Sequence, residues 1–482
     1  MGVRRSFFNR PVLFYFGDRN PGIVADTRQN PNRPWLLAAV FVAALIGALY
    51  TFRTPINIWL SQGQEVRDIK FQPADVQAFM ARAKAADAMV DPLARCLAFP
   101  DIPGSHWPGN DVRTYCQYQY GPHITPEQIG AYLDRGDVAG LEALFRKDLD
   151  RHFSKSEFSE VIHKDFESID ADDASERLTA RWLAASPGSA FAHMARGYYF
   201  QTMAWRARGN AYADATPEAK MRQMAEYAGQ AVEQLHQSVQ LEPRMMPAYA
   251  ALESIAMMVS SDDIQDFAQT RGTAEDPGCM PLSDAMMDAL RPEWGGSAGQ
   301  MSELSEQLAA SADARPLLRM VMERSDAAAG VALYRQKKYH ESVWPLSQAA
   351  FESTEPGILE RLAYATSKTN GIEADLRWET IVLQLEATRF RLPPAQLTDD
   401  VANMLTLVAG ETEWAISIVK RRLVAEPDNA YLHFALGRYY QMAGRKMQAS
   451  EQYQLATRDP YYAPDAKAKI YQMAHPLPTE QK

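Results

Sequence analysis

The chain has 482 residues, of which 46% are hydrophobic and 23% are charged, and its formal net charge is −10. This composition is typical of a folded globular protein and excludes a disordered or collagen-like chain. The acidic balance also argues against nucleic acid as a partner, because phosphate binding requires clustered lysine and arginine. The length allows two or three domains or one long repeat array.

The net charge is distributed unevenly between the N-terminal region and the rest of the chain. Residues 1–34 form a short basic tail of charge +4, and residues 35–52 contain no charged side chain before Arg53. As a helix this apolar stretch spans about 27 Å, close to the ~30 Å hydrocarbon thickness of a bilayer. We therefore predict a transmembrane helix over 35–53. The positive-inside rule then places the tail in the cytoplasm and the acidic bulk, 54–482, in the periplasm, anchored to a bacterial inner membrane.

Three alternatives for this region remain open. A cleavable signal peptide has a shorter apolar stretch nearer the start of the chain. The pair Arg4-Arg5 resembles a twin-arginine export signal, although it lies far upstream of the apolar stretch. A buried helix of a soluble domain is the third. Small residues at four-residue spacing inside the predicted span also allow a homodimer, through Ala39, Ala43 and Gly47.

The next region, 54–125, is expected to hold a linker, a first helix and a loop between two cysteines. Three prolines interrupt the segment between Cys96 and Cys116, so we expect an irregular loop there. In an oxidising compartment a Cys96–Cys116 disulfide would stabilise such a loop by about 3 kcal/mol. Two unpaired thiols are the alternative. The third cysteine, Cys279, is expected to be a buried or loop thiol.

From about residue 72 onward the periodicity is helical, with apolar residues three and four positions apart and almost no strand pattern. Four segments show it most clearly, and each is predicted to be one amphipathic helix: 73–90, 125–153, 175–185 and 225–241. Turn and cap signals separate these segments. The sequence predicts an all-α chain built from successive helix pairs.

An internal repeat is the most specific pattern. Three positions near the C-terminus recur 34 residues later, namely Gly410, Ala415 and Val419 as Gly444, Ala449 and Tyr453. The spacing and residue types resemble the tetratricopeptide repeat, whose period is about 34 residues. The resemblance implies a tetratricopeptide-like α-solenoid following the membrane helix, with Gly437 and Ala449 at the contact between the two helices of one unit.

Two further units match less completely. One contains Gly330 followed by Leu346 on the next predicted helix. The other is split, because Gly197 lies on its first helix while Leu235 lies on a second helix that follows an insertion. We place the C-terminal repeats in 301–482.

A second resemblance covers roughly 90–260. Its upstream part is the stretch from Arg95 to Pro108. The other matching positions are Trp182, Pro187, Gly197, Trp205, Arg208 and Gly209. These residues resemble an uncharacterised bacterial family of tetratricopeptide-like helical proteins, domain of unknown function 4034. The resemblance implies a helical domain over 126–300 and carries no activity.

Motifs for catalysis and cofactor binding do not occur. The nine histidines form no His-Glu-x-x-His pair and no ligand spacing with cysteine, and no phosphate-binding or nucleophile-elbow motif is present. We therefore predict no metal, no cofactor and no enzymatic activity. Asp170, Asp172 and Asp173 could form a cation site, but a solvated turn before a helix capped at Ser175 explains them better.

Two groups of residues are candidates for a binding surface. Trp205, Arg206, Arg208 and Tyr212 combine aromatic rings with guanidinium groups that can bind a carboxylate. Packing within the fold is the alternative for this group.

The second group lies in the loop between the two cysteines. His106 and Trp107, together with Tyr115, Tyr118 and Tyr120, make an aromatic cluster that is either a recognition surface or part of the core.

We predict that the protein binds another protein or a peptide in a concave groove and is not catalytic, because stacked helix pairs form an extended curved surface. One alternative is an immunity or secretion-associated factor that binds a periplasmic toxin. Another is a hydrolase with a noncontiguous active site.

Overall fold

The structure, a computed structural model, describes residues 71–154, 160–209, 215–352, 355–369, 378–390 and 393–475. These ranges form 23 α-helices and contain no β-strand, as the sequence predicts. The chain divides into two compact units, Met1–Gln64 and Glu65–Lys482, and every described residue belongs to the second. The predicted tail, the predicted membrane helix over 35–53 and the predicted dimer contact through Ala39, Ala43 and Gly47 lie outside the described residues.

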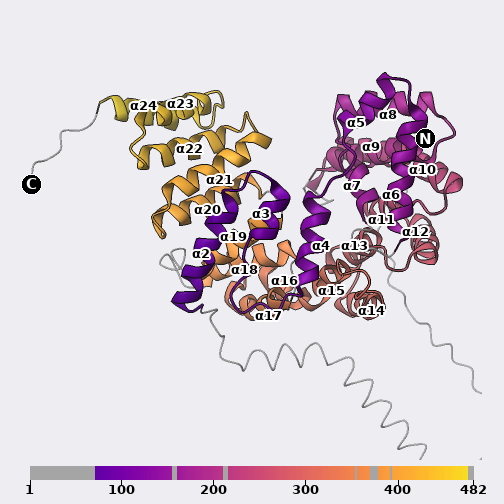
Figure 1. The fold of residues 1–482 in the computed structure, drawn as a ribbon, viewed down its shortest axis with the longest axis horizontal. Helices are drawn as coiled ribbons and strands as arrows, with labels where there is room; N and C mark the ends of the chain where they lie inside the picture. Colours follow the sequence, from indigo (N-terminus) through magenta and orange to yellow (C-terminus); the bar gives the residue numbers. More distant parts are fainter. Residues whose placement is uncertain are drawn as a thin grey trace, which may run out of the picture. The chain divides into compact units, whose positions relative to one another are not determined.

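Eleven helices make up the first part of the second unit (Figure 1). Their bounds are α2 Pro73–Asp87, α3 Pro92–Ala98, α4 Gly109–Tyr120, α5 Pro126–Asp134, α6 Val138–His152, α7 Val161–Glu167, α8 Asp173–Ala185, α9 Ala190–Arg208, α10 Glu218–Leu241, α11 Met246–Val259 and α12 Asp262–Glu275.

The remaining α-helices follow in the chain, with one short 3-10 turn, η2, between α13 and α14. Their bounds are α13 Met280–Ala289, η2 Pro292–Trp294, α14 Ala298–Ala309, α15 Leu318–Asp326, α16 Ala328–Arg335, α17 Tyr339–Glu352, α18 Pro356–Thr369, α19 Trp378–Phe390, α20 Ala395–Leu407, α21 Thr412–Ala425, α22 Ala430–Met442, α23 Lys446–Ala456 and α24 Ala463–Ala474. Among the described helices, none combines the length and apolar character needed to cross a bilayer.

The predicted single helix over 125–153 is two helices, so that prediction was wrong. Thr125 and Gln128 form a capping box that starts α5. The chain then turns at Gly136, whose φ of 68° lies in the left-handed region that favours glycine. The side chain of Asp137 accepts a hydrogen bond from the Gly140 amide and starts α6. The apolar periodicity continues across this turn and hides it in the sequence.

The loop between the cysteines is less irregular than predicted. Its prolines all precede Gly109, and α4 begins directly after Pro108, so no proline lies inside the helix. Cys96 at α3 and Cys116 on α4 form a disulfide, with their Cα atoms 5.7 Å apart. The predicted bond is therefore formed, and it joins two short helices rather than closing an unstructured loop.

The helix pairs predicted from the repeats have close contacts at their glycines. A Cβ atom added at Gly197 of α9 would lie 2.7 Å from Leu235 of α10, and one at Gly437 of α22 would lie 2.7 Å from Tyr453 of α23. Between α16 and α17 the corresponding pair is Gly330 and Leu346, at 2.8 Å. A larger residue at any of these glycines would push the paired helices apart. The described helices are consistent with a helical solenoid.

The described residues contain two hydrophobic clusters. One contains buried side chains of α5–α12 with the start of α13, and the other contains those of α13–α24. Helices α2–α4 belong to the second cluster, since Phe79 and Tyr115 are buried there and α2, α3 and α4 all contact α19. Figure 1 shows these indigo helices beside the orange and yellow ones. The beginning of the described chain thus packs on its C-terminal half.

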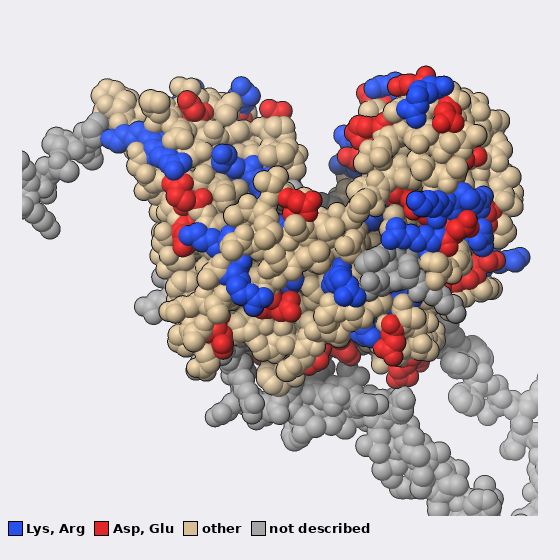
Figure 2. Space-filling view, viewed as in Figure 1, with Lys and Arg blue, Asp and Glu red and all other residues tan. Residues whose placement is uncertain are grey.

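Charged side chains of both signs are interspersed over the face seen in Figure 2. On that face, lysine and arginine do not form one continuous basic surface of the kind that a phosphate backbone would follow.

Candidate functional site

The first predicted binding group is occupied by contacts within the fold. Trp205 is partly buried and its Nε1 donates to Oγ of Ser254, 3.1 Å away. Arg206 donates to the carbonyl oxygen of Ala171. These bonds hold α9 against neighbouring segments.

The next residue of that group, Arg208, lies at the end of α9. The guanidinium of Arg208 lies 5.5 Å from the ring centroid of Trp294, a cation–π contact. Gly209 ends the helix with a φ of 68°. Tyr212 lies outside the described residues.

The second predicted group is divided between surface and core. The His106 side chain is exposed, while Trp107 is only 7% exposed and packs on Phe390 of α19. Nε1 of Trp107 donates to the carbonyl oxygen of Ala350, and the amide of His106 donates to that of Phe351. The loop is therefore fixed to the end of α17, and Trp107 takes part in packing.

The three aspartates lie at the start of α8, but the N-cap residue differs from the one predicted. Oδ1 of Asp172 accepts from the Ser175 amide, 2.7 Å away, so Asp172 and not Ser175 is the N-cap. Asp170 accepts from the amide of Ala171. Local turn hydrogen bonds thus account for two of the three carboxylates.

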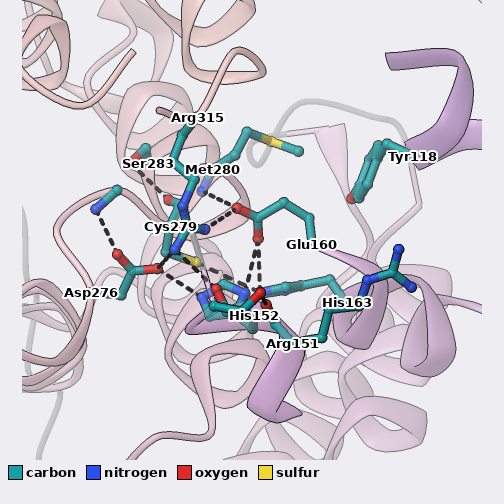
Figure 3. Close-up of polar contacts among 12 residues, drawn as sticks. Tyr118, Arg151, His152, Glu160, His163, Asp276, Cys279, Met280, Ser283 and Arg315 are labelled. Carbon is teal, nitrogen blue, oxygen red and sulfur yellow. Dashed lines mark hydrogen bonds and ion pairs between the residues drawn. The ribbon is translucent and has the colours of Figure 1, made fainter. Parts of the chain in front are cut away.

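Four buried side chains that the sequence did not connect meet between α6, α7 and α13. They are His152 at the end of α6, Glu160 at the N-cap of α7, His163 on α7 and Cys279 at the N-cap of α13. We call these four residues the His152 cluster (Figure 3). Each is at most 4% exposed, and one potential ligand atom from each lies within 4.8 Å of the others.

The donor atoms of the cluster point toward one another (Figure 3). Oε2 of Glu160 lies 3.3 Å from Nδ1 of His152 and 3.7 Å from Nε2 of His163. Sγ of Cys279 lies 3.6 Å from Nε2 of His163. Two imidazoles, a carboxylate and a thiol therefore share one small buried volume.

Two further residues surround the cluster and orient its members. Oδ2 of Asp276 lies 2.8 Å from Nε2 of His152, which directs the other nitrogen of this ring toward Glu160. Arg315 donates to Oε1 of Glu160 at 3.1 Å and to Oδ2 of Asp276 at 3.2 Å. Because Arg315 binds one oxygen of Glu160, the other oxygen faces the histidines.

The cluster residues have strongly shifted pKa values. Burial disfavours a charged imidazole, but Glu160 and Asp276 outweigh it and hold the pKa of His152 well above its usual value. Burial raises the pKa of Glu160, but the charge of His152 outweighs it and lowers that pKa to about 2. Burial lowers the pKa of His163 to about 3 and raises that of the Cys279 thiol to about 11. His152 thus carries the positive charge of the protonated cluster.

Sequence reasoning missed this cluster because its parts are not neighbours in the chain. His163 and Cys279 are separated by 116 positions, and no local sequence motif predicts their contact. The available signal was the short distance between His152 and His163 along the chain, with an acidic residue between them.

A surface groove of about 1000 Å³ forms a second candidate site. Helices α16, α18 and α20 and the turn η2 contribute to its lining. We call it the tyrosine–arginine groove, after the lining residues Tyr334, Tyr364, Arg335 and Arg361. The ring centroids of Tyr334 and Tyr364 lie 5.8 Å apart in an edge-to-face contact, and Tyr364 is 41% exposed.

Arginine side chains crowd one part of this groove. Arg335 is paired with Glu293, and Nε of Arg291 lies 3.0 Å from the same carboxylate. Nη1 of Arg361 donates to the carbonyl oxygen of Gly357, 2.7 Å away. Burial lowers the pKa of the Arg361 guanidinium, the carboxylates of Glu355 and Glu360 raise it, and Arg335 and Arg291 lower it further. Guanidinium groups and carboxylates therefore lie side by side in this part of the groove.

Comparison with known families identifies part of this arrangement. Residues 144–262 match the family described as Domain of unknown function (DUF4034). The matched segment contains the six residues from Trp182 to Gly209 on which the sequence resemblance was based, whereas the stretch from Arg95 to Pro108 lies outside it. The DUF4034 segment includes three members of the His152 cluster, while Cys279 follows it in the chain. No curated protein matches the chain.

Proposed function

We propose that this protein binds a peptide segment of another protein in the tyrosine–arginine groove. The observation that carries the proposal is the lining of a groove of about 1000 Å³ by partly exposed tyrosines beside crowded arginines. Tyrosine and arginine are enriched at protein interfaces, where rigid rings and guanidinium groups supply most of the binding free energy. A stack of helix pairs provides such a surface without catalytic groups.

The lining also indicates the chemistry of the peptide. Arg361 lies near Arg335 and Arg291 as well as Glu355 and Glu360, and its guanidinium can form a charge-assisted hydrogen bond with a carboxylate of the ligand, from an acidic side chain or a C-terminus. Tyr364 offers an exposed ring edge for an apolar or aromatic side chain of the same peptide. The expected ligand is therefore a short acidic segment with at least one bulky side chain.

Selection from a random peptide library with the immobilised full chain tests this proposal. We expect enriched peptides to share a carboxylate, and Arg361→Ala to weaken their binding about tenfold to a hundredfold, because a charge-assisted hydrogen bond contributes about 1.5–3 kcal/mol. Arg458→Ala is a matched control, since Arg458 is 70% exposed on its side chain and does not line the groove.

Crosslinking from a photoreactive phenylalanine in place of Tyr364 provides a second test of peptide binding in the groove. The photoreactive residue should crosslink to the selected peptide, whereas the same residue in place of Tyr471, which is 65% exposed on α24, should not. Equal binding by Arg361→Ala and Arg458→Ala, or equal crosslinking at the two tyrosine positions, would contradict peptide binding in this groove.

A second part of the proposal concerns the cellular location and membrane topology of the protein. Residues 35–53 would anchor the protein in a bacterial inner membrane, with 54–482 in the periplasm. The uncharged stretch, the basic tail before it and the Cys96–Cys116 disulfide support this topology, because disulfides persist in oxidising compartments. Alkaline phosphatase fused to the C-terminus should be active. An inactive fusion, combined with activity of a cytoplasmic reporter at the same position, would reverse the orientation.

A further inference from the structure

The His152 cluster has the composition of a metal site rather than of an ordinary buried ion pair. Two imidazoles, a thiol and a carboxylate supply the nitrogen, sulfur and oxygen donors that zinc accepts in proteins. All four side chains are buried, and they come from three helices. A lone buried cysteine has no such meaning, but here its sulfur lies 3.6 Å from a histidine nitrogen.

The distances among these donors agree with a tetrahedral site. Two nitrogen or oxygen ligands at about 2.0 Å from zinc lie about 3.3 Å apart, and a nitrogen and a thiolate sulfur lie about 3.6 Å apart. Oε2 of Glu160 and Nδ1 of His152 are 3.3 Å apart, and Sγ of Cys279 and Nε2 of His163 are 3.6 Å apart. The remaining separations are at most 4.8 Å, so small side-chain shifts would complete the tetrahedron.

The residues around the cluster act as supports for metal ligands. A zinc-bound histidine usually donates its second N–H to a carboxylate, which fixes the ring and raises its basicity as a ligand. Asp276 does this for His152. Arg315 holds Asp276 and the outer oxygen of Glu160, and its positive charge with that of Zn²⁺ balances one thiolate and two carboxylates.

We propose that His152, Glu160, His163 and Cys279 bind one zinc ion through Nδ1, Oε2, Nε2 and Sγ, respectively. Four protein ligands leave no coordination position for a substrate, so this is a structural site. Zinc binding releases the thiol proton of Cys279 and the extra proton of the charged His152 imidazole to solvent, whereas His163 is already neutral and offers the lone pair of Nε2. The ion connects α13 to α6 and α7, across 116 positions of chain between His163 and Cys279.

Cobalt substitution tests the site in the full chain. The protein is stripped with a chelator and then supplied with Zn²⁺ alone or Co²⁺ alone. We expect one ion per chain by elemental analysis and a thiolate-to-cobalt charge-transfer band. The chain has three cysteines and two form the disulfide, so Cys279 is the one thiol able to produce that band.

Two variants and a control complete the experiment. Cys279→Ser should abolish the charge-transfer band and weaken zinc binding at least tenfold, and His163→Gln should weaken it similarly. His433→Gln should change neither, because His433 is also buried but lies in the C-terminal repeats. Circular dichroism checks that each variant is folded. If a variant does not fold, the wild-type spectrum still decides. A wild-type chain that binds no stoichiometric ion, or whose cobalt complex lacks the thiolate band, would overturn the proposal.

Discussion

Two buried charged clusters connect distant parts of this chain, and they neutralise charge in different ways. In the first, Asp87 of α2 accepts hydrogen bonds from Nε of Arg95, from both terminal nitrogens of Arg421 and from Nε1 of Trp414, each at 2.7 Å. In the His152 cluster, Arg315 binds one oxygen of Glu160 at 3.1 Å, and the other oxygen faces two imidazoles and a thiol instead of further arginine donors (Figure 3).

The difference separates an ion pair from a ligand set. Both oxygens of Asp87 are saturated by N–H donors, and arginine keeps its charge at any ordinary pH, so nothing in this cluster can be exchanged for a metal. Each donor of the His152 cluster can offer a lone pair to a metal in its unprotonated form. We call Asp87, Arg95, Trp414 and Arg421 the Asp87 cluster. We conclude that this cluster fixes α2 and α3 to α21, whereas the His152 cluster has the donor atoms of a zinc site.

The largest effect is expected from removing the carboxylate of the Asp87 cluster. Asp87→Ala leaves Arg95, which is 6% exposed, buried without its charged partner, and should lower the free energy of unfolding by about 3–5 kcal/mol. Urea denaturation measures this change. Asp134→Ala is the control, because Asp134 forms an exposed pair with Arg181 and should cost at most about 1 kcal/mol. Equal effects of the two changes would refute the distinction.

Removing the Cys96–Cys116 disulfide tests how much a covalent bond between α3 and α4 contributes to stability. Replacing Cys96 and Cys116 together with serine should lower stability by about 3 kcal/mol, since the bond restricts the unfolded chain. The metal content of the His152 cluster should not change, because neither residue belongs to it. Loss of zinc in this double variant would show that the two regions are coupled.

A change next to the proposed ligands gives a smaller effect of a different kind. Asp276→Asn removes the charged partner of His152 and should weaken zinc affinity about tenfold to a hundredfold, or 1.4–2.7 kcal/mol. Competition with a chromophoric chelator measures the affinity. Asp87→Asn serves as the comparison and should leave zinc affinity unchanged; a parallel loss there would remove the assigned role of Asp276.

A third buried carboxylate, Glu386, is expected to make the stability of the fold depend on pH. Burial raises the pKa of Glu386 on α19 to about 7, although Arg389 at 3.0 Å opposes it. The folded chain therefore binds a proton here that the unfolded chain releases near pH 4.5. Its contribution, on the order of 1–2 kcal/mol, is present below that pH and declines as pH rises through about 7. Glu386→Gln should flatten this part of the stability profile between pH 5 and 8, and an unchanged slope would contradict the assignment.

Local signals in the sequence predicted much of the fold. The helical periodicity and the repeat glycines predicted an all-α chain, and the contacts of Gly197, Gly330 and Gly437 confirm the helix pairs. The break at Gly136 was missed because apolar periodicity continues on both sides of it. These outcomes concern interactions between residues close in the chain or repeated at a fixed period.

The sites depended on contacts that no local pattern records. Trp107 and Trp205 have the composition of binding residues, yet both donate hydrogen bonds within the fold. His163 and Cys279 meet only because α7 and α13 pack together, and the absence of a ligand motif led to the prediction of no metal. The sequence shows which metal-ligand side chains the chain contains. Which of them come into contact depends on the packing of helices that are distant in the chain.

X-ray absorption at the zinc edge of the zinc-loaded full chain tests the central claim most directly. The proposed site predicts four ligands, with one sulfur at about 2.3 Å and three nitrogen or oxygen atoms at about 2.0 Å from the ion. A first shell of oxygen and nitrogen alone, or a coordination number of six, would contradict zinc binding by His152, Glu160, His163 and Cys279.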